Sequence, residues 1–185
     1  MRIAFIIYDG MTALDFVGVY DPVTRLKSMG FMPDLEWDVC AYSNPVEGSG
    51  LLFTPAKVAE PLGDYDMVIV PGGFGTRTLV EDAGFLEWLR TSADCKFKIS
   101  VCTGSILLGA AGLLNGKKAT THPTSFEELK QYCNVVDRRI VDEGDVITAR
   151  GVTSAIDLGL YLCEKLAGRD VKERIRVQMD YQTII

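Results

Sequence analysis

A cysteine stands where an apolar run gives way to small and hydroxyl residues, in the stretch FKISVCTGSILLGAAG. The KISV run predicts a buried strand, and the residues after Cys102 predict a helix. A sharp turn from strand to helix lifts the residue at the turn above the sheet, beside unpaired N–H groups of the first helical turn. We therefore expect the helix dipole to lower the pKa of Cys102, which would make this thiol a nucleophile.

Backbone donors for such a site are expected from two places. The N–H of Thr103 would point to where negative charge develops on a substrate, and the Pro-Gly-Gly turn at Gly72 and Gly73 lets a second backbone come close. Together they would form an oxyanion-type pocket, with about 3 kcal/mol of transition-state stabilisation per donor. The glycine turn alone is weak evidence, because many strands end in this way.

Two further residues are candidates for proton transfer. Asp15 lies between Leu14 and Phe16, where a carboxylate is hydrogen-bonded, caps a helix or belongs to a site. His122, the single histidine, follows Cys102 by 20 positions in ATTHPTS. It could be a catalytic base or an ordinary loop residue. The sequence leaves open whether Asp15 and His122 have a catalytic or a purely structural role.

Composition narrows the class of protein. The 185 residues have a formal net charge of −6 and no basic patch, which argues against nucleic-acid binding. No apolar run reaches the roughly 18 residues of a membrane span, and the N-terminus lacks a signal-peptide pattern. The five cysteines have wide spacings with no CxxC pattern, which favours reduced thiols in a cytoplasm over disulfides or a metal site. Apart from Cys102 we interpret them as buried packing residues: Cys40, Cys95, Cys133 and Cys163.

Short Ile- and Val-rich runs alternate with longer segments of helical period, which is typical of an α/β protein with a mostly parallel sheet. In such a sheet Asp15, the glycine turn and Cys102 would meet at the carboxyl edge. We expect one domain over 1–185 and a helix break or kink near Asp21, because Pro22 follows. The expected strands are 2–8, 36–43, 64–73, 97–102 and a hairpin over 138–151, with a short extension at 51–55. The expected helices are 11–30, 78–93, 105–116, 153–168 and 169–181.

The segments VIVPGG, ISVCTGSILLGAAGLLNGKKATTHP and LDFVG resemble the ThiJ/PfpI superfamily, relatives of the class I glutamine amidotransferases. LDFVG and the CTG elbow are similar to its isocyanide hydratase branch and to the amino-terminal domain of some AraC-type regulators. The resemblance implies a flavodoxin-like three-layer sandwich with a cysteine nucleophile elbow, and a homodimer. We do not expect a regulator, because the chain ends at Ile185 without a helix-turn-helix segment.

The resemblance also implies roles for single residues. Cys102 matches the family's nucleophile and Asp15 its acidic partner. Thr103 stands where protease-like members have a histidine, which speaks against peptidase activity. His122 matches a histidine of the wider family and is expected to have a secondary role here, and Val19 stands where relatives often have proline.

The activity implied by the resemblance is hydration of an isocyanide, a small-molecule substrate, to an N-substituted formamide. Cys102 would form a thioimidate, Asp15 would move protons, and Thr103 would orient Asp15 or water, with no cofactor or metal. A thiolate beside a carboxylate is a like-charge pair, so one of the two should hold a proton at rest. The alternatives are glyoxalase- or deglycase-like chemistry on 2-oxoaldehydes, with His122 as base, and a redox sensor at Cys102 without turnover. Whether Asp15 or His122 lies beside the sulfur would distinguish the first two.

Overall fold

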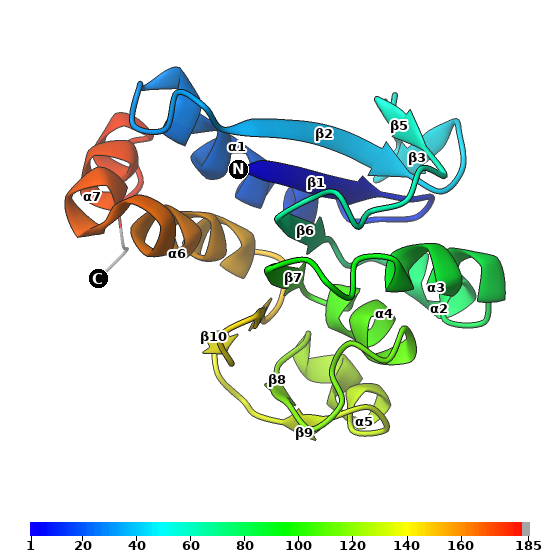
Figure 1. The fold of residues 1–185 in the computed structure, drawn as a ribbon. Coiled ribbons are helices and arrows are strands. Elements are labelled where there is room, and N and C mark those ends of the chain that lie inside the picture. Colours follow the sequence, from blue (N-terminus) through cyan, green and yellow to red (C-terminus); the bar gives the residue numbers. More distant parts are fainter. Residues whose placement is uncertain (183–185) are drawn as a thin grey trace.

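A seven-stranded, mostly parallel sheet forms the centre of the molecule (Figure 1). The computed structural model describes residues 1–182. The strand order is β10-β11-β7-β6-β1-β2-β5, and each neighbouring pair is parallel except β10 with β11. The strands are β1 (Arg2–Ile7), β2 (Glu36–Ala41), β5 (Lys57–Val58), β6 (Met67–Val70), β7 (Phe97–Val101), β10 (Ile140–Asp142) and β11 (Val146–Ala149).

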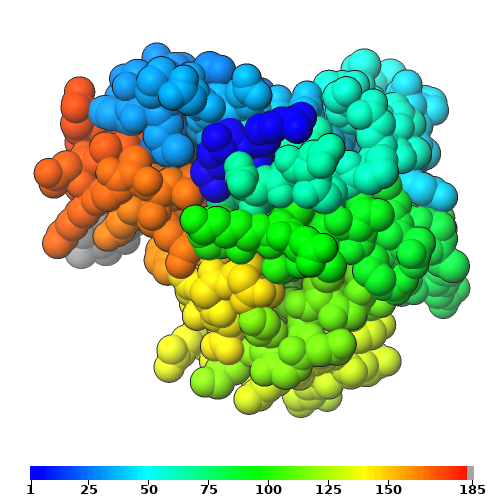
Figure 2. Space-filling view, viewed as in Figure 1, coloured from blue at the N-terminus to red at the C-terminus, as the bar shows by residue number. Residues whose placement is uncertain are grey.

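Helices cover both faces of this sheet, which confirms the predicted three-layer, flavodoxin-like arrangement (Figure 1). One group, in which α1 packs on α6 and α7, consists of α1 (Ala13–Ser28), α6 (Ser154–Ala167) and α7 (Arg169–Gln178). In Figure 2 the orange and red C-terminal helices lie beside the light-blue segment that follows α1. The second group consists of α2 (Thr76–Leu79), α3 (Ala83–Arg90), α4 (Gly104–Ala110) and the adjoining α5 (Phe126–Leu129).

Smaller elements lie outside the main sheet. The segment expected as a short extension is β4 (Leu51–Phe53), which pairs antiparallel with β3 (Val46–Gly48) rather than with the large sheet. A second small sheet joins β8 (Lys118–Ala119) to β9 (Asn134–Val135), and the 3₁₀ helix η1 spans Pro123–Ser125. The predicted hairpin is confirmed, since β10 and β11 pair antiparallel.

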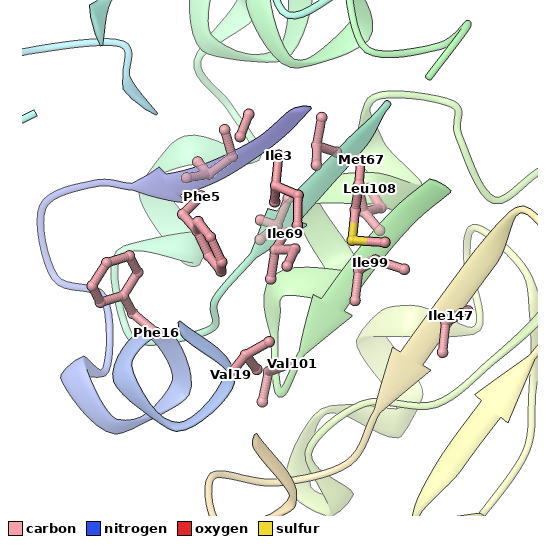
Figure 3. Packing of buried hydrophobic residues seen from close by; sticks show 14 of the residues in the cluster. Ile3, Phe5, Phe16, Val19, Met67, Ile69, Ile99, Val101, Leu108 and Ile147 are labelled. Carbon is pink, nitrogen blue, oxygen red and sulfur yellow. The ribbon is translucent and has the colours of Figure 1, made fainter. Parts of the chain in front are cut away.

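The core lies on both faces of the sheet, and between α1 and the sheet its side chains are almost completely buried. Figure 3 shows Phe16 and Val19 of α1 pointing toward the strands that carry Phe5 and Val101. The rings of Phe5 and Phe16 meet edge to face with their centroids 6.1 Å apart. Every residue of β6 and β11 is buried, as expected of parallel strands covered on both faces. This packing holds the carboxyl ends of β1, β6 and β7 in one place.

Two predicted helices have different bounds in the structure. The helix expected over 78–93 is divided into α2 and α3, because Asp82 caps α3 by accepting a hydrogen bond from the Phe85 N–H at 3.0 Å. The helix expected over 105–116 ends at Ala110. Gly112 has a φ of +81°, a left-handed conformation that stops a helix.

Of the break or kink predicted near Asp21, the break is wrong, because α1 continues through Pro22 to Ser28. Tight packing on α6 accounts for this. A Cβ built on Gly18 would lie 2.7 Å from the Ala155 Cβ, and one on Gly159 would lie 2.8 Å from the Pro22 Cγ. Burial against α6 therefore outweighs the loss of one backbone hydrogen bond at the proline. Among residues 1–182, no helix has the length and apolar character needed to cross a membrane.

Candidate active site

Cys102 occupies a sharp elbow between β7 and α4. Its φ is +53°, a left-handed conformation that is rare for residues other than glycine and typical of functional turns. Its N–H donates to the Arg150 carbonyl at 2.8 Å, which holds the elbow against β11. Gly104 must be glycine here, because a Cβ would lie 2.3 Å from the Val70 carbonyl oxygen. The elbow predicted from the CTG sequence is therefore present.

Asp15 lies in the first turn of α1 and is fully buried. Its Oδ2 accepts a hydrogen bond from the Gly72 N–H at 3.0 Å. Its Oδ1 has no hydrogen-bond partner among the described residues, but Asp15 and the Cys102 thiol are close enough for each to shift the pKa of the other. Burial raises the pKa of Asp15 to about 6, although the Gly72 N–H and the Cys102 thiol partly offset this.

The expected lowering of the Cys102 pKa is wrong for the resting site. Burial, followed by the negative charge of Asp15, raises the pKa of the Cys102 thiol to about 12. The N–H and hydroxyl of Thr103 act in the opposite direction but are weaker. At neutral pH Cys102 is therefore a neutral thiol and Asp15 is mostly ionised, so the thiol holds the proton of the pair.

The two glycines do not offer free donors as expected. The Gly72 N–H is used by Asp15, and the Gly73 N–H donates to the Thr103 Oγ1 at 2.9 Å. The Thr103 hydroxyl in turn lies 3.2 Å from the Gly73 carbonyl. A Cβ on Gly72 would lie 2.5 Å from the Thr103 nitrogen, so only glycine permits this approach. The amides of the turn therefore position Asp15 and Thr103, while Gly73 also lines the cavity described below.

Tyr8, at the end of β1, is a residue that the sequence analysis missed. Its hydroxyl donates to the Pro71 carbonyl at 2.6 Å, and its ring is buried. Burial, Asp15 and Cys102 together raise the pKa of Tyr8 well above its usual value. A polar aromatic residue at the end of the apolar strand RIAFII was the available signal. The Tyr8 hydroxyl fixes the Pro71 carbonyl, and the glycines that follow Pro71 hold Asp15 and Thr103 through their amides.

A cavity of about 160 Å³ opens over the thiol. His122 lines it, with its Nδ1 2.8 Å from the Thr124 Oγ1 and its ring against Gly151. Asp15, and not His122, is among the groups that shift the pKa of Cys102. Among the described residues no three His, Cys, Asp or Glu side chains are grouped as a metal site would require. The lining residues are Thr12, Gly73, Phe74, Arg77, Cys102, Thr103, His122, Thr124, Ser125 and Val152.

The fold and the elbow place this chain among flavodoxin-like α/β proteins with a cysteine above the carboxyl edge of the sheet. The profile of the DJ-1/PfpI family matches residues 1–165, and the chain belongs to that family. It is 35% identical over 184 residues to the isonitrile hydratase of Pseudomonas putida, which covers 98% of this chain and 78% of that protein.

Other relatives differ in name. The chain is 32% identical over 129 residues to Protein DJ-1alpha of Drosophila melanogaster, which covers 68% of this chain and 59% of that protein. Among solved structures it is similar to a ThiJ/PfpI family protein from Pseudomonas syringae. There the TM-score is 0.90 at 31% identity, with 100% of this chain and 76% of that chain covered. Because the family contains members with different names, membership alone does not assign an activity.

Proposed function

We propose that the protein is a cofactor-independent hydratase that adds water to a small isocyanide and releases an N-substituted formamide. The observation that carries this proposal is the pairing of the Cys102 thiol with Asp15, a buried carboxylate whose pKa is raised to about 6. The 35% identity with a protein named isonitrile hydratase, over nearly the whole chain, supports the same chemistry.

The first half of the proposed reaction forms the thioimidate. Asp15 accepts the thiol proton while the Cys102 Sγ attacks the terminal carbon of R–N≡C. The carbon then takes this proton from Asp15, which gives R–N=CH–S–Cys102 and restores the carboxylate. The N–H and hydroxyl of Thr103 stabilise the sulfur anion during the attack, since both favour the thiolate.

The second half hydrolyses the thioimidate. Asp15 takes a proton from water as the oxygen adds to the carbon, and the nitrogen receives that proton. The O–H proton then passes through Asp15 to the sulfur as the C–S bond breaks. R–NH–CHO leaves, and the thiol and carboxylate are restored. Gly72 holds Asp15 in place throughout through the N–H···Oδ2 bond.

The alternatives have less support. Aldehyde chemistry with His122 as base would need this ring at the sulfur, yet its Nδ1 is hydrogen-bonded to Thr124 and it does not shift the pKa of Cys102. A redox sensor at Cys102 is supported by the similarity to DJ-1 proteins. It becomes an outcome of the test below.

The test is formamide production from cyclohexyl isocyanide by four proteins: wild type, Cys102→Ser, Asp15→Asn and the control Cys133→Ser. Turnover should be lost without the Cys102 thiol and fall about 100-fold or more without the Asp15 base. Cys133 is half-buried and outside the cavity lining, so its variant should match wild type.

Equal losses in Cys102→Ser and Cys133→Ser would remove the nucleophile assignment. If wild type leaves isocyanides unchanged but consumes methylglyoxal, the aldehyde activity replaces this proposal. If it consumes neither and Cys102 gains oxygen under mild peroxide, the sensor replaces it.

We also propose that the chain forms a homodimer, as the resemblance implies. The support is a set of exposed apolar side chains near the start of α1 and on β4. The Ala13 N–H donates to the Ser49 Oγ at 3.0 Å, which brings the β3–β4 loop onto α1. These side chains are Leu14, Val17, Leu51 and Leu52.

A further inference from the structure

The cavity over Cys102 contains one permanently charged side chain, Arg77 of α2, among its described lining residues. Its guanidinium lies over the ring of Phe74, 5.2 Å from the centroid. Phe74 is itself 82% exposed, which is unusual for a large aromatic side chain and leaves this cation–aromatic pair at the mouth of the cavity. Packing of the core does not require either side chain there.

The donors of Arg77 are largely unused. Its nearest acidic neighbour is Glu128 of α5, at 3.8 Å between Nη2 and Oε1, and both side chains are almost half exposed. That distance is too long for a hydrogen bond, and an exposed ion pair of this kind contributes little stability. We find no hydrogen bond from this guanidinium to any residue in the 1–182 range. Its charge and N–H groups are therefore available to a ligand.

Ser125 also lines the cavity, but it does not offer a second donor. It is completely buried and its Oγ has almost no accessible surface, so a ligand in the cavity does not reach this hydroxyl. Arg77 is therefore the group that an anionic ligand would meet.

We propose that the substrate carries an anionic group, such as a carboxylate, which Arg77 binds while the reacting carbon meets Cys102. This inference rests on the proposed hydratase function. The preference must be local, because a chain with a net charge of −6 does not attract anions as a whole. A cavity of about 160 Å³ is close to the ~150 Å³ that holds one benzene, so the part of the substrate that lies inside it is compact. The proposed class is short isocyano carboxylic acids.

The first arm of the test compares isocyanoacetate with its uncharged methyl ester. Wild type should have the higher kcat/KM for the anion, and Arg77→Gln should lower the anion-to-ester ratio about 10- to 100-fold, as expected for a charge-assisted hydrogen bond. Arg77→Lys should keep part of the preference, because it keeps the positive charge. Lys130→Gln removes the same charge from an exposed position outside the cavity lining and should leave the ratio unchanged.

The second arm measures binding without turnover, by calorimetry with N-formylglycine and its methyl ester. Wild type should bind the acid more tightly, and Arg77→Gln should bind both alike. Equal ratios in wild type and Arg77→Gln in both arms would overturn the anion subsite. If the ester is turned over and the anion is not preferred, the anion subsite is overturned and the hydratase proposal stands. If the acid is bound more tightly but neither isocyanide is turned over, the hydratase proposal is overturned and the anion subsite stands.

Discussion

At the scale of single residues, Cys102 and Asp15 have one proton between them, and burial decides which of the two holds it. Removing a thiolate from water raises the pKa of the thiol to about 12, while the carboxylate titrates at about 6. The sulfur is consequently a neutral thiol at neutral pH. In the proposed mechanism the attack requires a base at the thiol, and Asp15 is the ionised group that its environment provides.

The raised pKa of Asp15 predicts a pH-dependent stability difference between wild type and Asp15→Asn. The folded pKa of about 6 lies above the unfolded value of 3.8, so the contribution of Asp15 is fully present below pH 3.8 and is lost as pH rises through 6. The free energy of unfolding of wild type, relative to the variant, should fall by on the order of 2–3 kcal/mol between pH 4 and pH 7. Denaturant titrations of both proteins across this range measure it. A constant difference would mean that Asp15 is not desolvated.

At the scale of elements, the contact between α1 and α6 positions the acid. Both helices have glycine at the contact, so their backbones come close, and the Cys163 thiol donates to the Pro22 carbonyl at 3.3 Å. Since Asp15 is one turn from Gly18 on the same helix, the fit between these helices also sets the position of the carboxylate over the elbow.

Gly18→Ala should therefore destabilise the protein by about 1–3 kcal/mol, because the new methyl group meets the Ala155 Cβ at 2.7 Å. Ala155→Gly in the same chain should restore much of the loss, since it removes the opposing methyl group. Thermal unfolding of both single variants and the double variant measures this coupling. Ser28→Ala, at an exposed position of α1 outside the apolar patch, is the control and should have little effect. Additive single effects would contradict the close contact.

At the scale of the whole molecule, the main core is well covered but several apolar side chains remain on the surface. Those of the β3–β4 hairpin and of α1 lie near each other, because Ser49 binds the backbone at the start of α1. Monomeric proteins rarely leave such side chains grouped in water, which is the physical basis for the proposed homodimer.

Leu52→Glu should weaken this dimer at least tenfold, because Leu52 is 78% exposed and a charge there would be buried by the partner. Light scattering at micromolar concentrations measures the shift toward monomer. Val177→Glu, at a 66% exposed position on α7, should leave the dimer intact. A wild-type protein that remains monomeric at 100 times higher concentration would remove the proposal.

Sequence patterns determined the order of elements and the elbow. Ile- and Val-rich runs identify β1, β6 and β7, and a strand that ends in Cys-Thr-Gly predicts the turn at Cys102. The same patterns misplaced several helix ends. Asp82 and Gly112 end or begin helices through local hydrogen bonds and dihedral angles that periodicity does not register.

Only the tertiary structure decided the electrostatics of the site. Residue types indicated that Asp15 and Cys102 could share a proton, but the expected thiolate depended on a helix dipole, and burial is the larger effect. The amides of Gly72 and Gly73 were likewise predicted as donors to a substrate, yet folding directs them to Asp15 and Thr103. Distances and solvent exposure arise from segments far apart in the chain. A sequence therefore specifies which groups are available, and the fold specifies which of them meet and how far water is excluded.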